Sequence, residues 1–164
     1  KLEIENKKYI VYGLSHALLD LLDGKDYDVK KSIFIETGGM KGLRDEIEKD
    51  KLHKIISDGF NTNNVHSEYA MTELLSQSYS SEKQLFMTPP WKKVLIKDFN
   101  DPLKVKRNGR GFLNIIDLAN KYSCPFISTE DVGEVYENGN FKLFGRGSDA
   151  DLRGCNLMLG DQNN

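Results

Sequence analysis

Cysteine is scarce in this sequence, which contains Cys124 and Cys155 among 164 residues. Two cysteines are too few for a disulfide framework, and neither has neighbours at a metal-ligand spacing. This scarcity excludes small disulfide-stabilised domains and structural zinc modules. We therefore expect the protein to work in a reducing, cytoplasmic environment.

Long apolar runs are also missing. No run approaches the roughly 20 residues that a membrane-spanning helix requires, and no segment has the pattern of a secretory signal. Neither sign of charge dominates, because 25 acidic residues face 23 basic ones and the net charge is −2. The basic residues are dispersed, whereas a protein that grips nucleic-acid phosphates concentrates them. The sequence thus predicts no membrane span and no nucleic-acid partner.

The composition that remains is typical of a globular domain, with 38% hydrophobic and 29% charged residues. A chain of this length forms one domain or one lobe of a larger enzyme. Its first half alternates strands and helices, and the helices show apolar positions at helical spacing. We expect a buried strand at 9–12, a helix at 14–22, a strand at 32–35 and a helix at 50–60. This alternation predicts a parallel sheet covered by helices, with Asp50 capping the second helix.

The pattern changes from Phe86 onward. Two adjacent prolines exclude a helix, and short strands follow without helices between them, which predicts a small antiparallel sheet or a distorted barrel. Asn138 and Gly139 lie between alternating segments and form a strong hairpin signal. We expect Trp91 to anchor the core of this part. The predicted fold is α/β, a parallel βαβα lobe at 1–85 followed by a smaller, mostly antiparallel β subdomain at 86–147 and a C-terminal segment at 148–164.

Polar side chains gather where a strand near Val65 ends. Residues 66–73 read His-Ser-Glu-Tyr-Ala-Met-Thr-Glu, and we expect a helix to begin after them. Ligands of open α/β sheets bind at such strand ends. Tyr69 offers a flat face for a base, Thr72 a hydroxyl for a phosphate, and Glu73 a carboxylate for Mg²⁺. A short motif of this kind is equally compatible with an ordinary loop tip.

Two further segments carry ligand chemistry. Residues 36–42 read Glu-Thr-Gly-Gly-Met-Lys-Gly after a strand, and their glycines let the backbone approach a flat ligand, although a simple reversing turn fits too. Residues 128–133 end in Asp-Val-Gly, and a hairpin leads from them to Gly145 and Arg146. We expect Asp131 to lie exposed at a sheet edge, where its carboxylate suits two ribose hydroxyls; a turn-initiating aspartate is the alternative.

These three segments together resemble the ordered motifs of adenylate-forming enzymes. Residues 69–73 are similar to the Tyr-Gly-x-Thr-Glu motif of that superfamily, with Ala70 in the place of the usual glycine. Residues 128–133 with Gly145-Arg146 resemble its Thr-Gly-Asp and Gly-Arg motifs. The longer string 67–77 is similar to one branch, the acyl-protein synthetases (LuxE-type). The resemblance spans roughly residues 33–158 and corresponds to the C-terminal half of such an enzyme.

The resemblance implies a ligase that uses ATP and Mg²⁺ to activate a fatty or other carboxylic acid as an acyl-adenylate. It places adenine beside Thr37, Gly38, Gly39 and Tyr69, the phosphate beside Thr72, Mg²⁺ on Glu73, and the ribose on Asp131 and Arg146. It also implies that Cys155 accepts the acyl group and that an acyl-accepting protein is a candidate partner, whereas Cys124 is expected to be structural. Packing remains an alternative role for Cys155.

One motif of the superfamily is missing from these 164 residues, the Ser/Thr/Gly-rich phosphate-binding loop. We therefore expect the chain to be inactive on its own. Two other functions stay open at this point, an acyl-CoA ligase of the phenylacetate type and a non-catalytic nucleotide-binding module. His16, His53 and His66 have no third metal ligand at a suitable spacing, and we expect them to be packing or surface residues.

Overall fold

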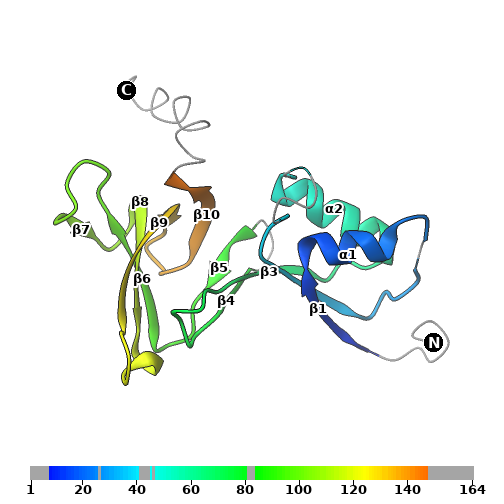
Figure 1. Cartoon of the computed structure of the whole chain (residues 1–164), viewed down its shortest axis with the longest axis horizontal. Helices are drawn as coiled ribbons and strands as arrows, with labels where there is room; N and C mark the ends of the chain where they lie inside the picture. The colour runs from blue at the N-terminus through cyan, green and yellow to red at the C-terminus, as the bar shows by residue number, and fades with distance from the viewer. Residues whose placement is uncertain (1–7, 26, 41–44, 46, 81–83, 148–164) are drawn as a thin grey trace. The chain divides into compact units, whose positions relative to one another are not determined.

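The computed structural model describes residues 8–25, 27–40, 45, 47–80 and 84–147 (Figure 1). Its internal contacts divide the chain into two compact units. The first unit takes the described residues of Lys1–Ala70 together with Gln77–Leu85, and the second takes Met71–Ser76 and the described residues of Phe86–Asn164. No signal in the sequence indicated that Met71–Ser76 belongs with the second unit.

The first unit is a small parallel sheet with two helices. Strands β1 (Ile10–Leu14), β2 (Ile33–Thr37) and β3 (Val65–Tyr69) pair in parallel, and β4 (Ser78–Ser80) pairs antiparallel with β3. Helix α1 (Ser15–Leu22) connects β1 to β2, and α2 (Lys49–Phe60) connects β2 to β3. This connectivity brings the carboxyl ends of β1, β2 and β3 to one edge of the sheet.

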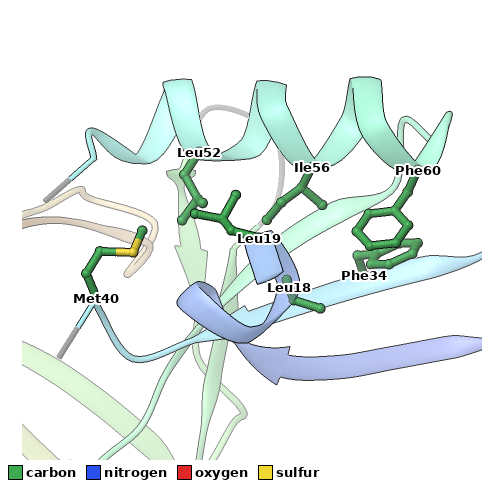
Figure 2. Packing of buried hydrophobic residues seen from close by; sticks show 7 residues of the cluster. All are labelled: Leu18, Leu19, Phe34, Met40, Leu52, Ile56 and Phe60. Carbon is green, nitrogen blue, oxygen red and sulfur yellow. The ribbon is translucent and has the colours of Figure 1, made fainter. Parts of the chain in front are cut away.

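The core of this unit lies between the helices and one face of the strands. Figure 2 shows Phe34 of β2 packed against Phe60 of α2, beside the leucine and isoleucine side chains of the cluster. The centroids of the two rings are 4.3 Å apart. The buried cluster comprises Leu18, Leu19, Phe34, Met40, Leu52, Ile56 and Phe60. Alternation along β2 puts Phe34 and Glu36 on this face, both at most 1% exposed.

The opposite face of β1 and β2 is open among the described residues. Ile10 is 70% exposed, and Tyr12, Leu14 and Ile33 are also exposed. The prediction of a buried strand at 9–12 is therefore wrong in its burial. The strand forms, but it pairs only with β2 at the end of the strand order, and side chains that alternate away from the helices have no neighbours to cover them.

Two other local predictions are wrong. Helix α2 starts after Glu48, which has no side-chain cap, and Asp50 lies inside the first turn. No helix follows residue 73, because the chain makes a turn in which the Leu74 amide donates to the Met71 carbonyl at 3.1 Å and then enters β4. Asp117, at the end of strand β8 (Gly109–Asp117), holds the residues of this turn.

The second unit is an antiparallel sheet. Its strand order is β5-β10-β9-β8-β6-β7. The bounds are β5 Phe86–Met87, β6 Lys92–Lys97, β7 Val105–Lys106, β8 Gly109–Asp117, β9 Phe126–Val135 and β10 Phe141–Arg146. A 3₁₀ turn, η2 (Leu118–Asn120), follows β8. The predicted hairpin is confirmed, since Gly139 adopts φ +84° in the turn between β9 and β10.

Aliphatic side chains form the core of the second unit, and Val94, Ile96, Leu113 and Ile115 are each at most 2% exposed. Trp91 is not part of it. The residue is 52% exposed, and its indole Nε1 donates to Ser76 Oγ at 2.8 Å. The prediction that Trp91 anchors the core is wrong, whereas the predicted α/β fold class is confirmed. Among the described helices none is long and apolar enough to cross a membrane.

Candidate functional site

A buried carboxylate marks the carboxyl ends of the parallel strands. Glu36 lies at the end of β2 with no exposed surface. Its Oε2 accepts from Ser15 Oγ at 2.6 Å, and Lys49 Nζ donates to Oε1 at 2.7 Å and to Oε2 at 2.8 Å. Ser67 Oγ donates to Oε1, and His53 Nε2 lies 3.5 Å from the same oxygen. Side chains from α1, α2 and β3 thus converge on one residue of β2.

The charge of Glu36 is compensated within this cluster. Burial raises the pKa of its carboxyl, but the hydrogen bond from His53 and the charge and hydrogen bond of Lys49 outweigh that effect and lower the pKa to about 2. Glu36 is therefore ionised at neutral pH. Lys49 keeps 41% of its side chain exposed, so the pair lies at the boundary between core and solvent.

The glycine-rich segment follows directly from this carboxylate. Gly38 adopts φ +70°, a conformation that favours glycine. Its carbonyl oxygen lies 3.3 Å from Ser15 Oγ and 3.3 Å from Lys49 Nζ, the same two groups that contact Glu36. Thr37 and Gly39 flank it, while Lys41 and Gly42 lie outside the described residues. The loop is thus held by the same side chains that contact the buried carboxylate.

A second carboxylate lies on the open face of the sheet. Glu68 of β3 accepts from the hydroxyls of Tyr12 and of Thr37, the latter at 2.8 Å, and Tyr79 Oη donates to it at 3.2 Å. The hydrogen bond to Glu68 raises the pKa of Tyr12. Thr37 is therefore brought next to β3 by a side-chain contact, and this contact places the two predicted adenine segments, 37–39 and 69, at neighbouring strand ends.

The residues of the Tyr-x-x-Thr-Glu segment differ in exposure. Tyr69 is buried, at 6% exposure, whereas Ala70, Thr72 and Glu73 are exposed. Ala70 has no positive φ, so the missing glycine leaves the backbone here in an ordinary region. Asn120 Nδ2 donates to the Glu73 carbonyl at 2.8 Å. The backbone of Glu73 is therefore fixed by a contact within the second unit, whereas the residue itself is exposed and accessible to a ligand.

Asp117, at the end of β8, holds the turn after Glu73. It is fully buried, and its Oδ2 accepts from the amides of Leu75 at 3.0 Å and Ser76 at 2.8 Å. Its Oδ1 accepts from Ser76 Oγ at 2.6 Å and from the Ala119 amide at 3.2 Å. Burial raises the pKa of Asp117, but these hydrogen bonds outweigh it and lower the pKa. These contacts hold the Leu75 and Ser76 amides and the Ser76 hydroxyl in place, and so fix the conformation of the turn.

Asp131 and Arg146 meet across two adjacent strands. They are register partners on β9 and β10, and Arg146 Nε lies 3.6 Å from Asp131 Oδ1. A bulge between Leu143 and Gly145, where φ is +134°, precedes the arginine. Asp131 retains 13% side-chain exposure and Arg146 75%. The prediction of an exposed edge carboxylate is wrong, because β9 lies between β8 and β10 in the sheet.

The structure thus groups the predicted site residues by unit. Thr37, Gly38, Gly39 and Tyr69 belong to the first unit; Thr72, Glu73, Asp131 and Arg146 belong to the second. Cys155 lies outside the described residues. Cys124, which we expected to be structural, is an exposed free thiol.

Sequence reasoning missed most of the Glu36 cluster. His53 was expected to pack or face solvent, but it lies 2.9 Å from Ser67 Oγ and beside Glu36. Lys49 and Ser15 carried no motif at all. The usable signal was Glu36 itself, a charged residue at an inward position of a strand whose neighbour Phe34 faces the core.

The chemistry of the described residues suits Mg²⁺ bound together with a phosphate ligand. The described part of the chain has no group of three or more His, Cys, Asp or Glu residues arranged to hold a metal by themselves. Mg²⁺ commonly uses one or two carboxylates and takes its remaining ligands from phosphate and water. The exposed Glu73 can supply one such carboxylate.

Comparison with known sequences gives one family match. The profile described as "Acyl-protein synthetase, LuxE" matches residues 2–163. No curated protein sequence matches the chain.

Comparison with solved structures gives the same fold. The chain is similar to ATP-bound MatB from Rhodopseudomonas palustris, with a TM-score of 0.62 and 17% identity over 86% of this chain and 31% of that one. It is also similar to O-succinylbenzoate coenzyme A synthetase (MenE) from Bacillus subtilis in complex with ATP and magnesium, with a TM-score of 0.58 and 18% identity over 86% and 32%. Coronafacic acid ligase from Pectobacterium brasiliense gives 0.61 and 15% over 85% and 30%. The chain spans about a third of the length of these proteins.

Proposed function

Because this chain belongs to the acyl-protein synthetase family, LuxE, we propose that it is the nucleotide-binding C-terminal half of an enzyme that activates a fatty acid with ATP and transfers the acyl group to a protein thiol. The family match over residues 2–163 is the observation that carries this proposal. The fold it shares with MatB and MenE, which were solved with ATP, supports the nucleotide.

In the first unit we assign adenine to the strand ends. Thr37, Gly38 and Gly39 would line one side of the base and Tyr69 the other. Support comes from the hydrogen bond between Thr37 and Glu68, the residue before Tyr69. It also comes from Gly38, which adopts a positive φ and has no side chain to obstruct a flat ligand.

In the second unit we assign the ribose and phosphates. The Asp131 carboxylate would accept hydrogen bonds from the two ribose hydroxyls, and Arg146, permanently charged and 75% exposed, would contact ribose or the α-phosphate. Thr72 would donate its hydroxyl to a phosphate oxygen, and Glu73 would provide a carboxylate to the magnesium of MgATP. The ion pair between Asp131 and Arg146 supports their assignment to one ligand.

The proposed reaction has two steps. In the first, the substrate carboxylate attacks the α-phosphorus of ATP. The bond between the α-phosphorus and the oxygen that bridges it to the β-phosphate breaks, so that pyrophosphate leaves and an acyl-adenylate forms. Bound magnesium would offset negative charge on the phosphates. Arg146 and Thr72 would hold the phosphate in line for attack. In the second step a thiolate attacks the acyl carbon, AMP leaves, and a thioester forms.

We assign the thiolate to Cys155. Its place in the sequence supports the assignment, because Arg153 stands two residues before it and a cation close to the thiol would favour the thiolate form. Cys124 offers a matched control, since it is an exposed free thiol whose Sγ lies 3.2 Å from the Phe126 carbonyl oxygen.

The complete protein incubated with ATP, Mg²⁺ and a radiolabelled fatty acid should gain a covalent label that hydroxylamine removes. Cys155→Ser should lose the label or convert it to an ester of lower hydroxylamine sensitivity, and Cys124→Ser should keep it unchanged. Label that persists on Cys155→Ser and disappears from Cys124→Ser would reverse the assignment.

The same experiment separates the acyl-CoA ligase alternative. MenE is a coenzyme A synthetase of this fold, so coenzyme A should be added in a parallel reaction. Formation of free acyl-CoA, with no label on any cysteine, would show that the acceptor is coenzyme A and that Cys155 is a packing residue. Absence of both products, with nucleotide still bound, would indicate a non-catalytic nucleotide-binding module.

A further inference from the structure

Glu36 is a buried carboxylate that has no part in the proposed chemistry. Nevertheless it lies where two proposed adenine-binding segments begin. Its partners Ser15, Lys49 and Ser67 come from the first residue of α1, the first residue of α2 and the middle of β3. One side chain therefore ties together the ends of β1, β2 and β3 with both helices.

The first connection runs to the glycine-rich loop. Ser15 Oγ contacts Glu36 at 2.6 Å and also lies 3.3 Å from the carbonyls of Thr37 and Gly38. Lys49 Nζ contacts both Glu36 oxygens and the Gly38 carbonyl. The Gly38 peptide therefore shares its two polar partners with the carboxylate, and its orientation depends on where the carboxylate holds them.

The second connection runs to Tyr69. Ser67 Oγ donates to Glu36 and lies 2.9 Å from His53 Nε2, while the Ser67 amide donates to Ser80 Oγ at 2.7 Å. Ser67 is buried on the same face of β3 as Tyr69, two residues further along. A shift of Ser67 toward or away from Glu36 would therefore move the end of β3 that carries Tyr69.

We propose that Glu36 and Lys49 form a positioning pair that sets the separation of the Gly38 peptide and the end of β3, and thereby the affinity of the enzyme for the adenine end of ATP. This inference rests on the proposed function. Neither residue is assigned to the reacting atoms, so the pair acts on nucleotide binding and leaves the adenylyl-transfer step unchanged.

This pair can be tested by steady-state kinetics of the complete protein. The assay is the fatty-acid-dependent exchange of labelled pyrophosphate into ATP. Glu36→Gln keeps the shape of the side chain and removes its charge; Lys49→Met removes the cation and keeps the aliphatic stem. Each should raise KM for ATP roughly tenfold, the effect of one charged hydrogen bond, with kcat within about twofold. Lys51→Met, an exposed lysine on the same helix, is the matched control and should leave both constants unchanged.

Rescue distinguishes positioning from a general need for stability. Lys49→Arg retains a cation able to contact Glu36 and should restore most of the affinity, whereas Lys49→Met should not. If Glu36→Gln fails to fold, the half-exposed Lys49 carries the test. An unchanged KM for ATP in Lys49→Met would overturn the proposal, and so would a fall in kcat at constant KM, because that pattern would place the pair in the chemical step.

Hydrogen exchange separates this inference from the proposed function. If the wild-type protein does not exchange pyrophosphate into ATP in the presence of any carboxylic acid, the proposed function fails. The positioning role of the pair is then tested by the protection of backbone amides against hydrogen exchange alone. Lys49→Met should accelerate amide exchange in the peptide 33–40 by roughly tenfold relative to Lys51→Met, since local opening follows the lost contact. Equal exchange in the two variants would overturn the positioning role.

Discussion

Glu36 and Asp117 are both fully buried carboxylates, one in each unit, and they are stabilised in different ways. Glu36 is surrounded by side chains from other elements, including the cation of Lys49. Asp117 is surrounded mainly by backbone amides of a turn and by one serine hydroxyl. The first arrangement neutralises a charge and couples helices to strands, whereas the second shapes a loop. The same residue chemistry thus serves tertiary assembly in one unit and local conformation in the other.

Removing the Asp117 side chain should have the largest effect on stability. Asp117→Ala leaves the amides of Leu75 and Ser76 and the buried Ser76 hydroxyl without this acceptor, and we expect the free energy of unfolding to fall by about 4 kcal/mol. Urea denaturation measures this. Glu137→Ala, at an exposed turn position, is the control and should change stability little. A loss for Asp117→Ala no larger than that of the control would show that water replaces the carboxylate and that the turn holds itself.

The pH dependence of stability should identify the contribution of Glu36. Its pKa is about 2 in the folded protein and 4.5 in the unfolded chain, so the unfolded state binds the proton first as pH falls. The stabilisation is complete above pH 4.5 and is lost between 4.5 and 2, by on the order of 3 kcal/mol in total. Asp117 contributes in the same direction, because its pKa is also lowered.

Comparing variants separates the two carboxylates in that titration. Glu36→Gln should show a shallower slope of stability against pH below 4.5 than the wild type, measured by denaturation at each pH. Identical slopes would mean that Asp117 and other carboxylates account for the acid sensitivity and that Glu36 contributes none of it.

Loss of Lys49 should have an intermediate effect. Lys49→Met leaves the buried Glu36 carboxylate without its cation, which usually costs 3–5 kcal/mol in a fully buried pair. Since the Lys49 side chain is 41% exposed, water screens the remaining charge and we expect about 2 kcal/mol. The double variant Glu36→Gln/Lys49→Met should be more stable than Lys49→Met alone. Strictly additive losses in this cycle would argue against coupling between the two residues.

The smallest effect is expected at Trp91. Trp91→Phe removes the indole donor to Ser76 Oγ and keeps an aromatic ring at a position that is 52% exposed. We expect about 1 kcal/mol, measured by thermal denaturation. A loss as large as that of Asp117→Ala would show that the tryptophan, rather than the carboxylate, organises the turn.

The predictable parts of this fold are those that neighbouring residues in the sequence determine. Apolar spacing located α1, α2 and the strands beside them, and Asn138-Gly139 located the hairpin because both residues accept positive φ. The prediction failed where a distant partner decides the outcome. Leu74 and Leu75 favour a helix by composition, but the segment forms a turn whose amides and Ser76 hydroxyl are held by Asp117, more than 40 residues away.

The candidate site shows the same division. The motifs at 37–39, 69–73, 131 and 146 could be found by spacing and order. The exposure of Asp131 could not be predicted, because it depends on the position of β9 between two other strands. The Glu36 cluster was not found either, since its contacts join residues 13 to 31 positions apart and neither Ser15 nor Lys49 belongs to a motif. The functional roles of the predicted residues stay predictions.

Exchange of labelled pyrophosphate into ATP tests the central claim most directly. The complete protein should catalyse exchange only when a fatty acid is present, and Asp131→Ala should lower that rate at least tenfold at subsaturating ATP through lost ribose contacts. The 164-residue chain alone, which lacks the phosphate-binding loop, should give none. Exchange without any carboxylic acid, or by the chain alone, would contradict the account, as would ATP binding by the complete protein with no exchange for any fatty acid.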